Sequence, residues 1–164
     1  MLAALFNITL FMKYLITGAN GYIGLRVLSA LSETDHHVVA VVRNKDRLPA
    51  ELCNLFGARL RIIELDFLVS PQDQVACPDD IDVAYYLIHS MGAGEGFSDQ
   101  ERQCAEHFKE WIKPTHCQQI IYLSGLIPEM PEGSKLSTHL ASRNQVFEIL
   151  QSSGVPLTTL RASI

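Results

Sequence analysis

Basic residues are in short supply in this 164-residue chain. Its 13 lysines and arginines face 18 aspartates and glutamates, which gives a formal net charge of −5. Proteins that bind nucleic acid or an anionic membrane surface present a cationic patch, so we expect neither of these partners. Charged residues make up only 19% of the sequence and hydrophobic residues 48%, which excludes a disordered chain. The length fits a single globular domain with a sizeable core.

Cysteine is also sparse, and no two cysteines form a C-x-x-C pair. Their wide separation excludes the spacing of a common zinc motif and that of a disulfide framework, so we expect no metal site. Reduced thiols are typical of the cytoplasm, which is the location that the sequence favours. The four positions are Cys53, Cys77, Cys104 and Cys117.

The apolar stretch at the N-terminus, residues 1–11, is too short to span a bilayer. It lacks the basic residues that precede the apolar part of a secretory signal, because the nearest positive charge, Lys13, follows it. A second methionine, Met12, stands directly before a predicted strand. We therefore expect residues 1–11 to be an extension from an alternative start, or else an extra edge segment, and residues 12–164 to form the domain.

Short β-rich runs alternate with amphipathic helical patterns along the rest of the chain. The continuous apolar run at residues 38–42 suits a strand buried on both faces, as in a parallel sheet. This alternation predicts an α/β fold with a doubly wound parallel sheet. The predicted strands are Lys13–Thr17, His37–Val42, Leu60–Leu65, Val83–His89, Gln119–Ser124 and Leu157–Leu160. The predicted helices are Gly21–Ser32, Leu48–Phe56, Ser98–Lys113 and Ser137–Ser152, with a short one near Gln72–Ala76.

A glycine-rich turn, TGANGYIG at residues 17–24, joins the first predicted strand to the first predicted helix. In such a turn the first glycine allows a sharp bend, the second leaves room for a phosphate near the backbone, and the third lets the helix pack closely. The helix N-terminus offers free N–H groups and a positive dipole end to the anion. The turn predicts a site for a dinucleotide pyrophosphate. The residues expected to contact this cofactor are Gly18, Asn20, Gly21, Tyr22, Ile23 and Gly24.

Ligands of such sheets lie at the carboxyl ends of the strands, and two of these ends carry charged residues. Arg43 stands 19 residues after Gly24, where an acid would bind the ribose of NAD and a cation suits the 2′-phosphate of NADP. Arg43 therefore favours NADP(H) over NAD(H), the alternative being a solvated surface arginine. At the end of the third strand, Asp66 could accept a hydrogen bond from the adenine amino group and Phe67 could border the ring. The alternative for Asp66 is a turn residue.

The remaining strand ends supply candidates for the chemistry. His89 and Ser90 end the fourth strand before a glycine-rich loop and are expected near the middle of the cofactor, although a histidine with a purely structural partner is an equal alternative. Ser124 ends the fifth strand and is expected near the nicotinamide. On the next helix, His139 and Arg143 are four residues apart and share a face.

These stretches together resemble the extended and atypical short-chain dehydrogenase/reductase superfamily of NAD(P)-binding Rossmann proteins. The closest likeness is to its NmrA-like and YbjT-like members, which are homologues of nucleoside-diphosphate-sugar epimerases. The resemblance extends over nearly all of residues 12–164. The stretches that carry it are TGANGYIG at 17–24, VRN at 42–44, LDF at 65–67, YYLIHSMGAG at 85–94, IIYLSGL at 120–126, LSTHLASRNQVFEIL at 136–150 and GVPLTTLRASI at 154–164.

The resemblance also implies catalytic residues, and here the sequence departs from the family. Active members carry a Ser or Thr on the fifth strand and a Tyr-x-x-x-Lys motif on the next helix, with the tyrosine as acid/base. Ser124 matches the hydroxyl, but the corresponding helix positions hold His139 and Arg143. Histidine exchanges protons near neutral pH, whereas arginine supplies only a fixed cation. A helix-surface or ribose-contacting His139 is the alternative to an acid/base.

Two functions follow from the resemblance. One is an NADP-dependent oxidoreductase or epimerase-like enzyme acting on an unknown small molecule, and the other is a non-catalytic NADP(H)-sensing module of the NmrA type that reports to a protein partner. Family members continue beyond the sixth strand, so we expect the substrate-binding C-terminal part to be missing after Ile164. A homo-oligomer through the helix Ser98–Lys113 is possible, but core packing is the favoured interpretation of Trp111.

Overall fold

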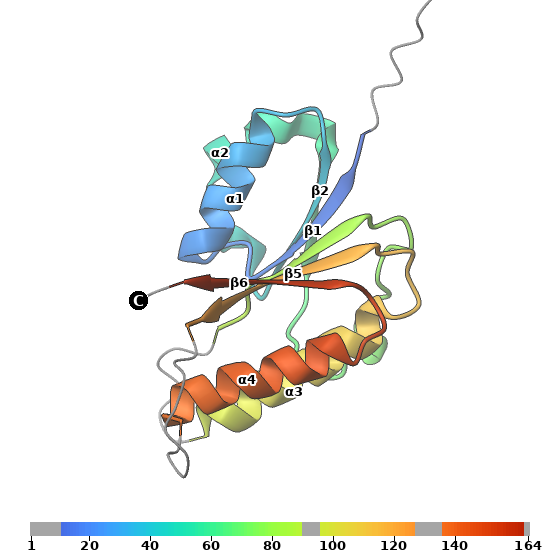
Figure 1. The fold of residues 1–164 in the computed structure, drawn as a ribbon. Coiled ribbons are helices and arrows are strands. Elements are labelled where there is room, and N and C mark those ends of the chain that lie inside the picture. Colours follow the sequence, from blue (N-terminus) through green and yellow to red (C-terminus); the bar gives the residue numbers. More distant parts are fainter. Residues whose placement is uncertain (1–10, 90–95, 127–135, 163–164) are drawn as a thin grey trace, which may run out of the picture.

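The fold is a six-stranded, fully parallel sheet with helices on both faces (Figure 1). The computed structural model describes residues 11–89, 96–126 and 136–162, so most of the predicted N-terminal extension lies outside the described residues. The strands are β1 (Lys13–Thr17), β2 (His37–Val42), β3 (Leu60–Glu64), β4 (Val83–Tyr86), β5 (Gln119–Gly125) and β6 (Leu157–Ala162). The helices are α1 (Tyr22–Ser32), α2 (Ala50–Phe56), α3 (Phe97–Ile112) and α4 (Thr138–Gln151), with short 3₁₀ turns η1 (Lys45–Arg47), η2 (Gly57–Arg59) and η3 (Pro71–Asp73).

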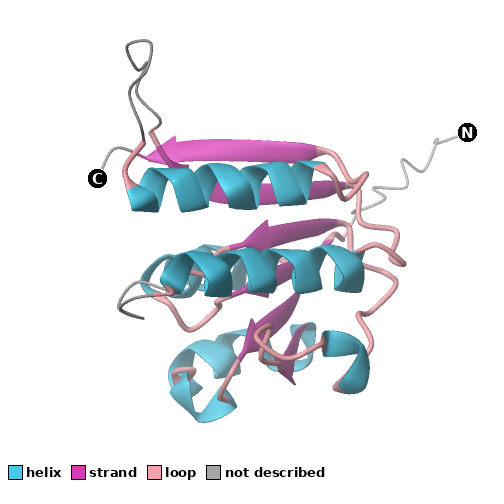
Figure 2. Ribbon diagram, turned by 90° about the horizontal axis from the view of Figure 1, so that it is seen from below, coloured by secondary structure: helices cyan, strands magenta, loops and turns pink. Residues whose placement is uncertain are grey.

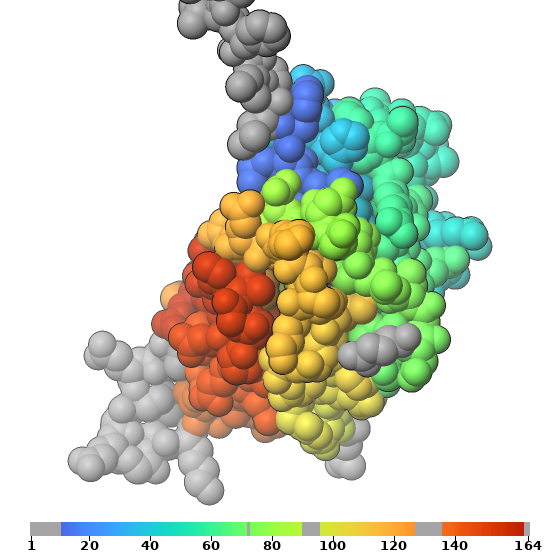
Figure 3. Space-filling view, turned by 90° about the vertical axis from the view of Figure 1, so that its right-hand side faces the viewer, coloured from blue at the N-terminus to red at the C-terminus, as the bar shows by residue number. Residues whose placement is uncertain are grey.

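The strand order β3-β2-β1-β4-β5-β6 is that of a doubly wound dinucleotide-binding sheet and confirms the predicted fold class. Helices α1 and α2 pack on one face of the sheet, while α3 and α4 lie side by side on the other (Figures 1 and 2). Figure 3 shows the surfaces of α3 and α4 adjoining on one side of the molecule. In this topology the chain winds in opposite directions from the centre, and β1 and β4 meet at the point where the direction changes.

Each face of the sheet has its own hydrophobic core, because successive strand residues point to opposite sides. Leu15 and Val39 belong to the core under α3 and α4, which also includes Phe108. Ile16 and Val38 belong to the core under α1 and α2. Both faces of the central strands are therefore covered, which explains the continuous apolar run of β2.

The amphipathic face of α3 packs into the protein's own core. Phe108, Trp111 and Ile112 are each at most 3% exposed, and the indole N–H of Trp111 donates to the carbonyl oxygen of Val75 at 2.7 Å. The favoured interpretation of Trp111 as a core residue is thus confirmed. These three side chains are unavailable for pairing two subunits. Among the described residues, no helix is long and apolar enough to cross a membrane.

Two predicted elements differ from the structure. The helix expected near Gln72–Ala76 is wrong, because that segment holds only the 3₁₀ turn η3. The fourth strand was predicted to reach His89 but ends at Tyr86. The reason lies in Thr17, whose buried hydroxyl donates to the carbonyl oxygen of Tyr85 and accepts from the N–H of Leu87, both at 3.1 Å. The side chain of Thr17 thus replaces the backbone ladder where β1 and β4 part.

Candidate functional site

A cavity of about 800 Å³ opens at the carboxyl edge of the sheet. Residues at the carboxyl ends of all six strands line it, together with the first turn of α1, two residues of α3 and one of α4. Its position across the β1–β4 switch point is where sheets of this topology bind their ligands. The lining includes most of the residues predicted from the sequence, namely Gly18, Asn20, Gly21, Tyr22, Ile23, Gly24, Arg43, Asp66, Phe67, His89, Ser124 and Arg143.

The glycine turn has the close packing that its sequence predicts. Gly18 has a φ of +63°, and a Cβ atom there would lie 2.9 Å from the carbonyl oxygen of Leu87. A Cβ atom on Gly24 would lie 2.4 Å from the carbonyl oxygen of Gly18 and 2.7 Å from that of Ala19. Real side chains do not tolerate these separations from backbone, so both positions require glycine.

The N-terminus of α1 faces the cavity and is suited to an anion. Gly21 precedes the helix without a side-chain cap, and the first turn contains no acidic residue. The first N–H groups of a helix have no intrahelical acceptor and carry the positive end of the dipole. The guanidinium of Arg26 lies 3.5 Å from the centre of the exposed Tyr22 ring and adds positive charge near this turn. Together with the glycine turn, these groups fit a dinucleotide pyrophosphate.

Arg43 and Asp66 lie at neighbouring strand ends on the wall of the cavity. Arg43 is exposed and has no ion-pair partner among the residues that the structure describes. One carboxylate oxygen of Asp66 accepts from the N–H of Leu68 at 3.0 Å, as the turn alternative predicts. The Gln74 amide also holds the Asp66 backbone, at 3.0 and 3.2 Å. A carboxylate offers about four lone-pair sites, so Asp66 retains acceptor capacity beside this hydrogen bond.

Phe67 contributes to the wall of the cavity from the core rather than as a free ring. It is 4% exposed, and its ring packs edge-on against Phe108 and Trp111, with ring centres 5.9 and 5.5 Å away. Cys104 of α3 lines the cavity beside it, and burial raises the pKa of its thiol to about 12. Phe67 and the neutral Cys104 thiol therefore form an apolar patch of the wall near the charged Arg43 and Asp66.

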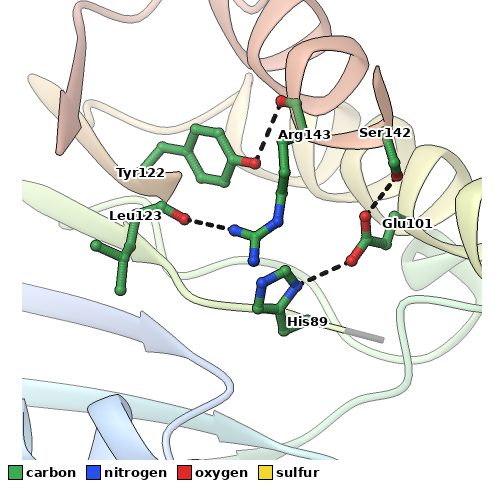
Figure 4. Close-up of polar contacts among 6 residues, drawn as sticks. All are labelled: His89, Glu101, Tyr122, Leu123, Ser142 and Arg143. Carbon is green, nitrogen blue, oxygen red and sulfur yellow. Dashed lines mark hydrogen bonds and ion pairs between the residues drawn. The ribbon is translucent and has the colours of Figure 1, made fainter. Parts of the chain in front are cut away.

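The opposite end of the cavity is polar. Ser124 of β5 lines this end and is only 3% exposed. Arg143 extends from α4 and donates from its guanidinium to the carbonyl oxygen of Leu123 at 3.2 Å (Figure 4). The buried Tyr122 hydroxyl donates to the backbone carbonyl oxygen of Arg143 at 3.3 Å, and burial raises the pKa of this phenol. Tyr122 therefore anchors α4 to β5 as a neutral group.

His89 lies beside this polar end and has a buried partner that the sequence did not reveal. Its Nδ1 atom lies 2.9 Å from a carboxylate oxygen of Glu101, and the other oxygen of Glu101 accepts a hydrogen bond from the Ser142 hydroxyl (Figure 4). The Glu101 side chain is 6% exposed and that of His89 is 30% exposed. Glu101 was missed because a charged residue on an amphipathic helix normally indicates the solvent side.

One predicted site residue, His139, is not brought to the cavity. The exposed ring of His139 stacks on Phe97, with ring centres 4.4 Å apart, and is not part of the cavity lining. It therefore does not share the position of Arg143, despite their spacing of four residues. Ser90 lies outside the described residues. Among the described residues, no group of three or more His, Cys, Asp or Glu side chains could hold a metal ion.

A family model described as NAD(P)H-binding matches residues 18–164, which is most of the chain and includes every strand end that lines the cavity. The chain belongs to this NAD(P)H-binding family. The predicted membership of the NAD(P)-binding Rossmann proteins is thereby confirmed. None of the curated proteins matches the chain.

Solved structures share the fold of this NAD(P)H-binding domain. UDP-glucuronic acid 4-epimerase from Bacillus cereus, in complex with NAD, superposes with a TM-score of 0.66 at 21% identity, over 93% of this chain and 56% of that chain. WbmG from Bordetella bronchiseptica, in complex with NAD, gives 0.72 at 14% identity, over 96% and 55%. A nucleoside-diphosphate-sugar epimerase from Staphylococcus aureus gives 0.71 at 16% identity, over 92% and 50%. The domain thus spans about half the length of these proteins.

Proposed function

We propose that this domain binds NADP(H) in preference to NAD(H) and serves an oxidoreductase or epimerase-like reaction on a small molecule. The observation that carries the cofactor preference is Arg43, an exposed cation on the cavity wall next to the glycine turn. It occupies the strand end at which an acid would instead accept the ribose hydroxyls of NAD. A guanidinium without another ion-pair partner is suited to two parallel hydrogen bonds with a phosphate.

The remaining residues divide the cofactor site into three parts. The N–H groups at the start of α1 would hold the pyrophosphate, and Asp66 would accept from the adenine amino group. Ser124 and Arg143 would lie at the nicotinamide end, where a bound nicotinamide supplies or accepts a hydride. There the Ser124 hydroxyl would hydrogen-bond a substrate oxygen, and the Arg143 guanidinium would hold a fixed positive charge beside it.

A non-catalytic NADP(H) sensor of the NmrA type is the second candidate function. It is supported by the absence of the Tyr-x-x-x-Lys pair and by the position of His139 outside the cavity. A sensor binds the cofactor without consuming it and changes its affinity for a protein partner with the redox form. The NmrA-like and YbjT-like kinship remains part of this proposal, as does a cytoplasmic location, which the free cysteines support.

Replacing Arg43 by alanine tests the cofactor preference. We expect wild-type protein to bind NADPH at least about tenfold more tightly than NADH, because hydrogen bonds to a charged group contribute roughly 1.5–3 kcal/mol. Arg43→Ala should bring the two dissociation constants, measured by isothermal titration calorimetry, to nearly the same value and leave NADH binding unchanged. Arg47→Ala is the control, because Arg47 is also exposed but does not line the cavity. Equal affinities in the wild type would contradict the preference.

A further inference from the structure

Glu101 is a carboxylate buried between three elements, with both of its oxygens occupied. One oxygen pairs with His89, just beyond β4, and the other with Ser142 on α4. Burying a carboxylate is costly unless polar partners compensate, and an apolar residue at this position of α3 would avoid that cost. Packing alone therefore does not explain Glu101. Its position does explain the orientation of His89.

The pairing with Glu101 fixes the His89 ring. A neutral imidazole facing a carboxylate through Nδ1 carries its proton on that nitrogen and leaves Nε2 as an acceptor. Figure 4 shows the second ring nitrogen on the side facing Arg143, away from Glu101. His89 lines the cavity whereas Glu101 does not, so the carboxylate contacts the ring from the core and not from the cavity.

The oriented ring lies at the same end of the cavity as the polar groups of β5. Strands β4 and β5 are neighbours, with Tyr86 opposite Tyr122, so the segments that follow these residues run side by side. His89 and Ser124, which belong to these segments, both line the cavity, as does Arg143 of α4. Among the described residues, the charged and titratable groups around the ring are Glu101 from α3, Arg143 from α4 and the buried Tyr122 from β5, with Tyr86 and Cys104 near Glu101 in the core.

We propose that His89 is the acid/base residue of this site and that Glu101 is its positioning residue. This inference rests on the proposed function, in which the domain serves hydride transfer to or from a small hydroxyl or carbonyl compound. When a substrate alcohol is oxidised, its O–H proton passes to Nε2 of His89, its C–H hydrogen leaves as hydride to the oxidised nicotinamide, and a C=O bond forms. In the reverse direction the imidazolium returns the proton to the oxygen as the carbon receives hydride.

The Glu101 carboxylate stabilises the imidazolium formed in this step, as a carboxylate does in other carboxylate–histidine pairs. The assignment also explains how the site operates without a tyrosine acid/base. His139, the residue at the corresponding helix position, stacks on Phe97 outside the cavity, while His89 supplies an imidazole within it.

The test compares three variants in NADPH-dependent reduction of 4-nitrobenzaldehyde, with NADPH affinity measured separately. We expect His89→Gln to lower kcat about 10²- to 10⁴-fold, the range for loss of a general acid, while the Kd for NADPH changes less than about twofold. His107→Gln is the matched control. His107 lies on α3 and is partly buried. Its Nδ1 atom forms a hydrogen bond with the carbonyl oxygen of Phe67 at 2.7 Å, and it does not line the cavity. It should keep kcat within about twofold.

Glu101→Gln separates positioning from simple structural support. The amide retains the shape and the bond to Ser142 but removes the negative charge that would stabilise the imidazolium formed during the reaction. We expect kcat for aldehyde reduction to fall while KM for the aldehyde and Kd for NADPH change less than about twofold. Urea unfolding should show that the variant is folded. Nitrogen NMR of the His89 ring should show the proton on Nδ1 in the wild type, whether or not cofactor is bound.

The possible failures are distinguishable. Protein that does not bind NADPH would overturn the proposed function itself. Protein that binds NADPH but does not reduce the aldehyde would contradict the proposed reaction and favour the sensor. A His89→Gln variant with unchanged kcat would overturn only the assignment of His89. An Nε2-protonated ring would overturn the orientation by Glu101.

Discussion

Gly24→Ala should weaken NADPH binding by at least about 100-fold and lower the free energy of unfolding by about 3 kcal/mol. The added Cβ atom would lie 2.4 Å from the carbonyl oxygen of Gly18, and two backbone atoms of Ala19 lie within 2.8 Å. Overpacking costs about 1–3 kcal/mol even where side chains can adjust, and here only backbone is available to move. Relief requires α1 to shift away from the turn, which displaces the N–H groups that face the cavity. Urea unfolding with and without NADPH measures both effects.

Gly125→Ala is the matched control for this substitution. A Cβ atom on Gly125 would lie 3.5 Å from a methyl group of Leu140, which is an ordinary contact, and Gly125 does not line the cavity. Gly125→Ala should lower the free energy of unfolding by less than about 1 kcal/mol and should retain NADPH binding. Similar midpoints for the two variants would show that the turn accommodates a side chain at Gly24.

Raising the pH from 9 to 10 should destabilise the domain by about 2 kcal/mol through two thiols. Burial raises the pKa of Cys77 and that of Cys104 from 9.0 to about 12 in the folded protein. Above pH 9 the unfolded chain releases these protons and the folded chain keeps them, so the unfolded state gains stability as the pH rises. The full contribution is present below the unfolded pKa and is lost progressively up to about pH 12. A full slope would give about 1.4 kcal/mol per pH unit for each thiol, but the unfolded thiols are already about half ionised at pH 9, so each contributes about 1 kcal/mol.

Urea unfolding at pH 8, 9 and 10 checks this expectation. The double variant Cys77→Ala/Cys104→Ala should reduce the dependence on pH. The remaining part comes from Cys117 and from the phenols of Tyr85, Tyr86 and Tyr122, because burial also raises the pKa of each of these groups. Val146→Ala is the control, because Val146 is a buried, non-titrating member of the same core as Cys104. It should lower stability equally at each pH. A double variant with the wild-type slope would contradict the assignment to these thiols.

The elements set by local sequence were predicted well. The glycine turn and the start of α1 follow from residues adjacent in the chain, and the apolar run of β2 marks a strand whatever surrounds it. The end of β4 was not predictable, because it depends on hydrogen bonds from Thr17, about 70 residues earlier. A local apolar pattern does not predict the residue at which two paired strands separate.

The polar end of the site was predicted only in part, because it depends on tertiary contacts. Glu101 pairs with His89, 12 residues earlier and just beyond β4, and with Ser142, 41 residues later on α4. His139 and Arg143 share a helical face, but the short imidazole packs on Phe97 while the long guanidinium reaches the carbonyl oxygen of Leu123. Helical spacing predicts a common direction and does not predict how far each side chain extends.

The separation of the two cores has a consequence for how this sequence tolerates change. Leu15 and Ile16 are adjacent in β1, yet they contact different cores on opposite faces of the sheet. Substitutions at such neighbours should act additively, because side chains without shared contacts have little coupling energy. Leu28 and Val38, ten residues apart, share one core and should need compensating changes. Covariation in this domain should therefore follow the faces of the sheet and not proximity along the chain.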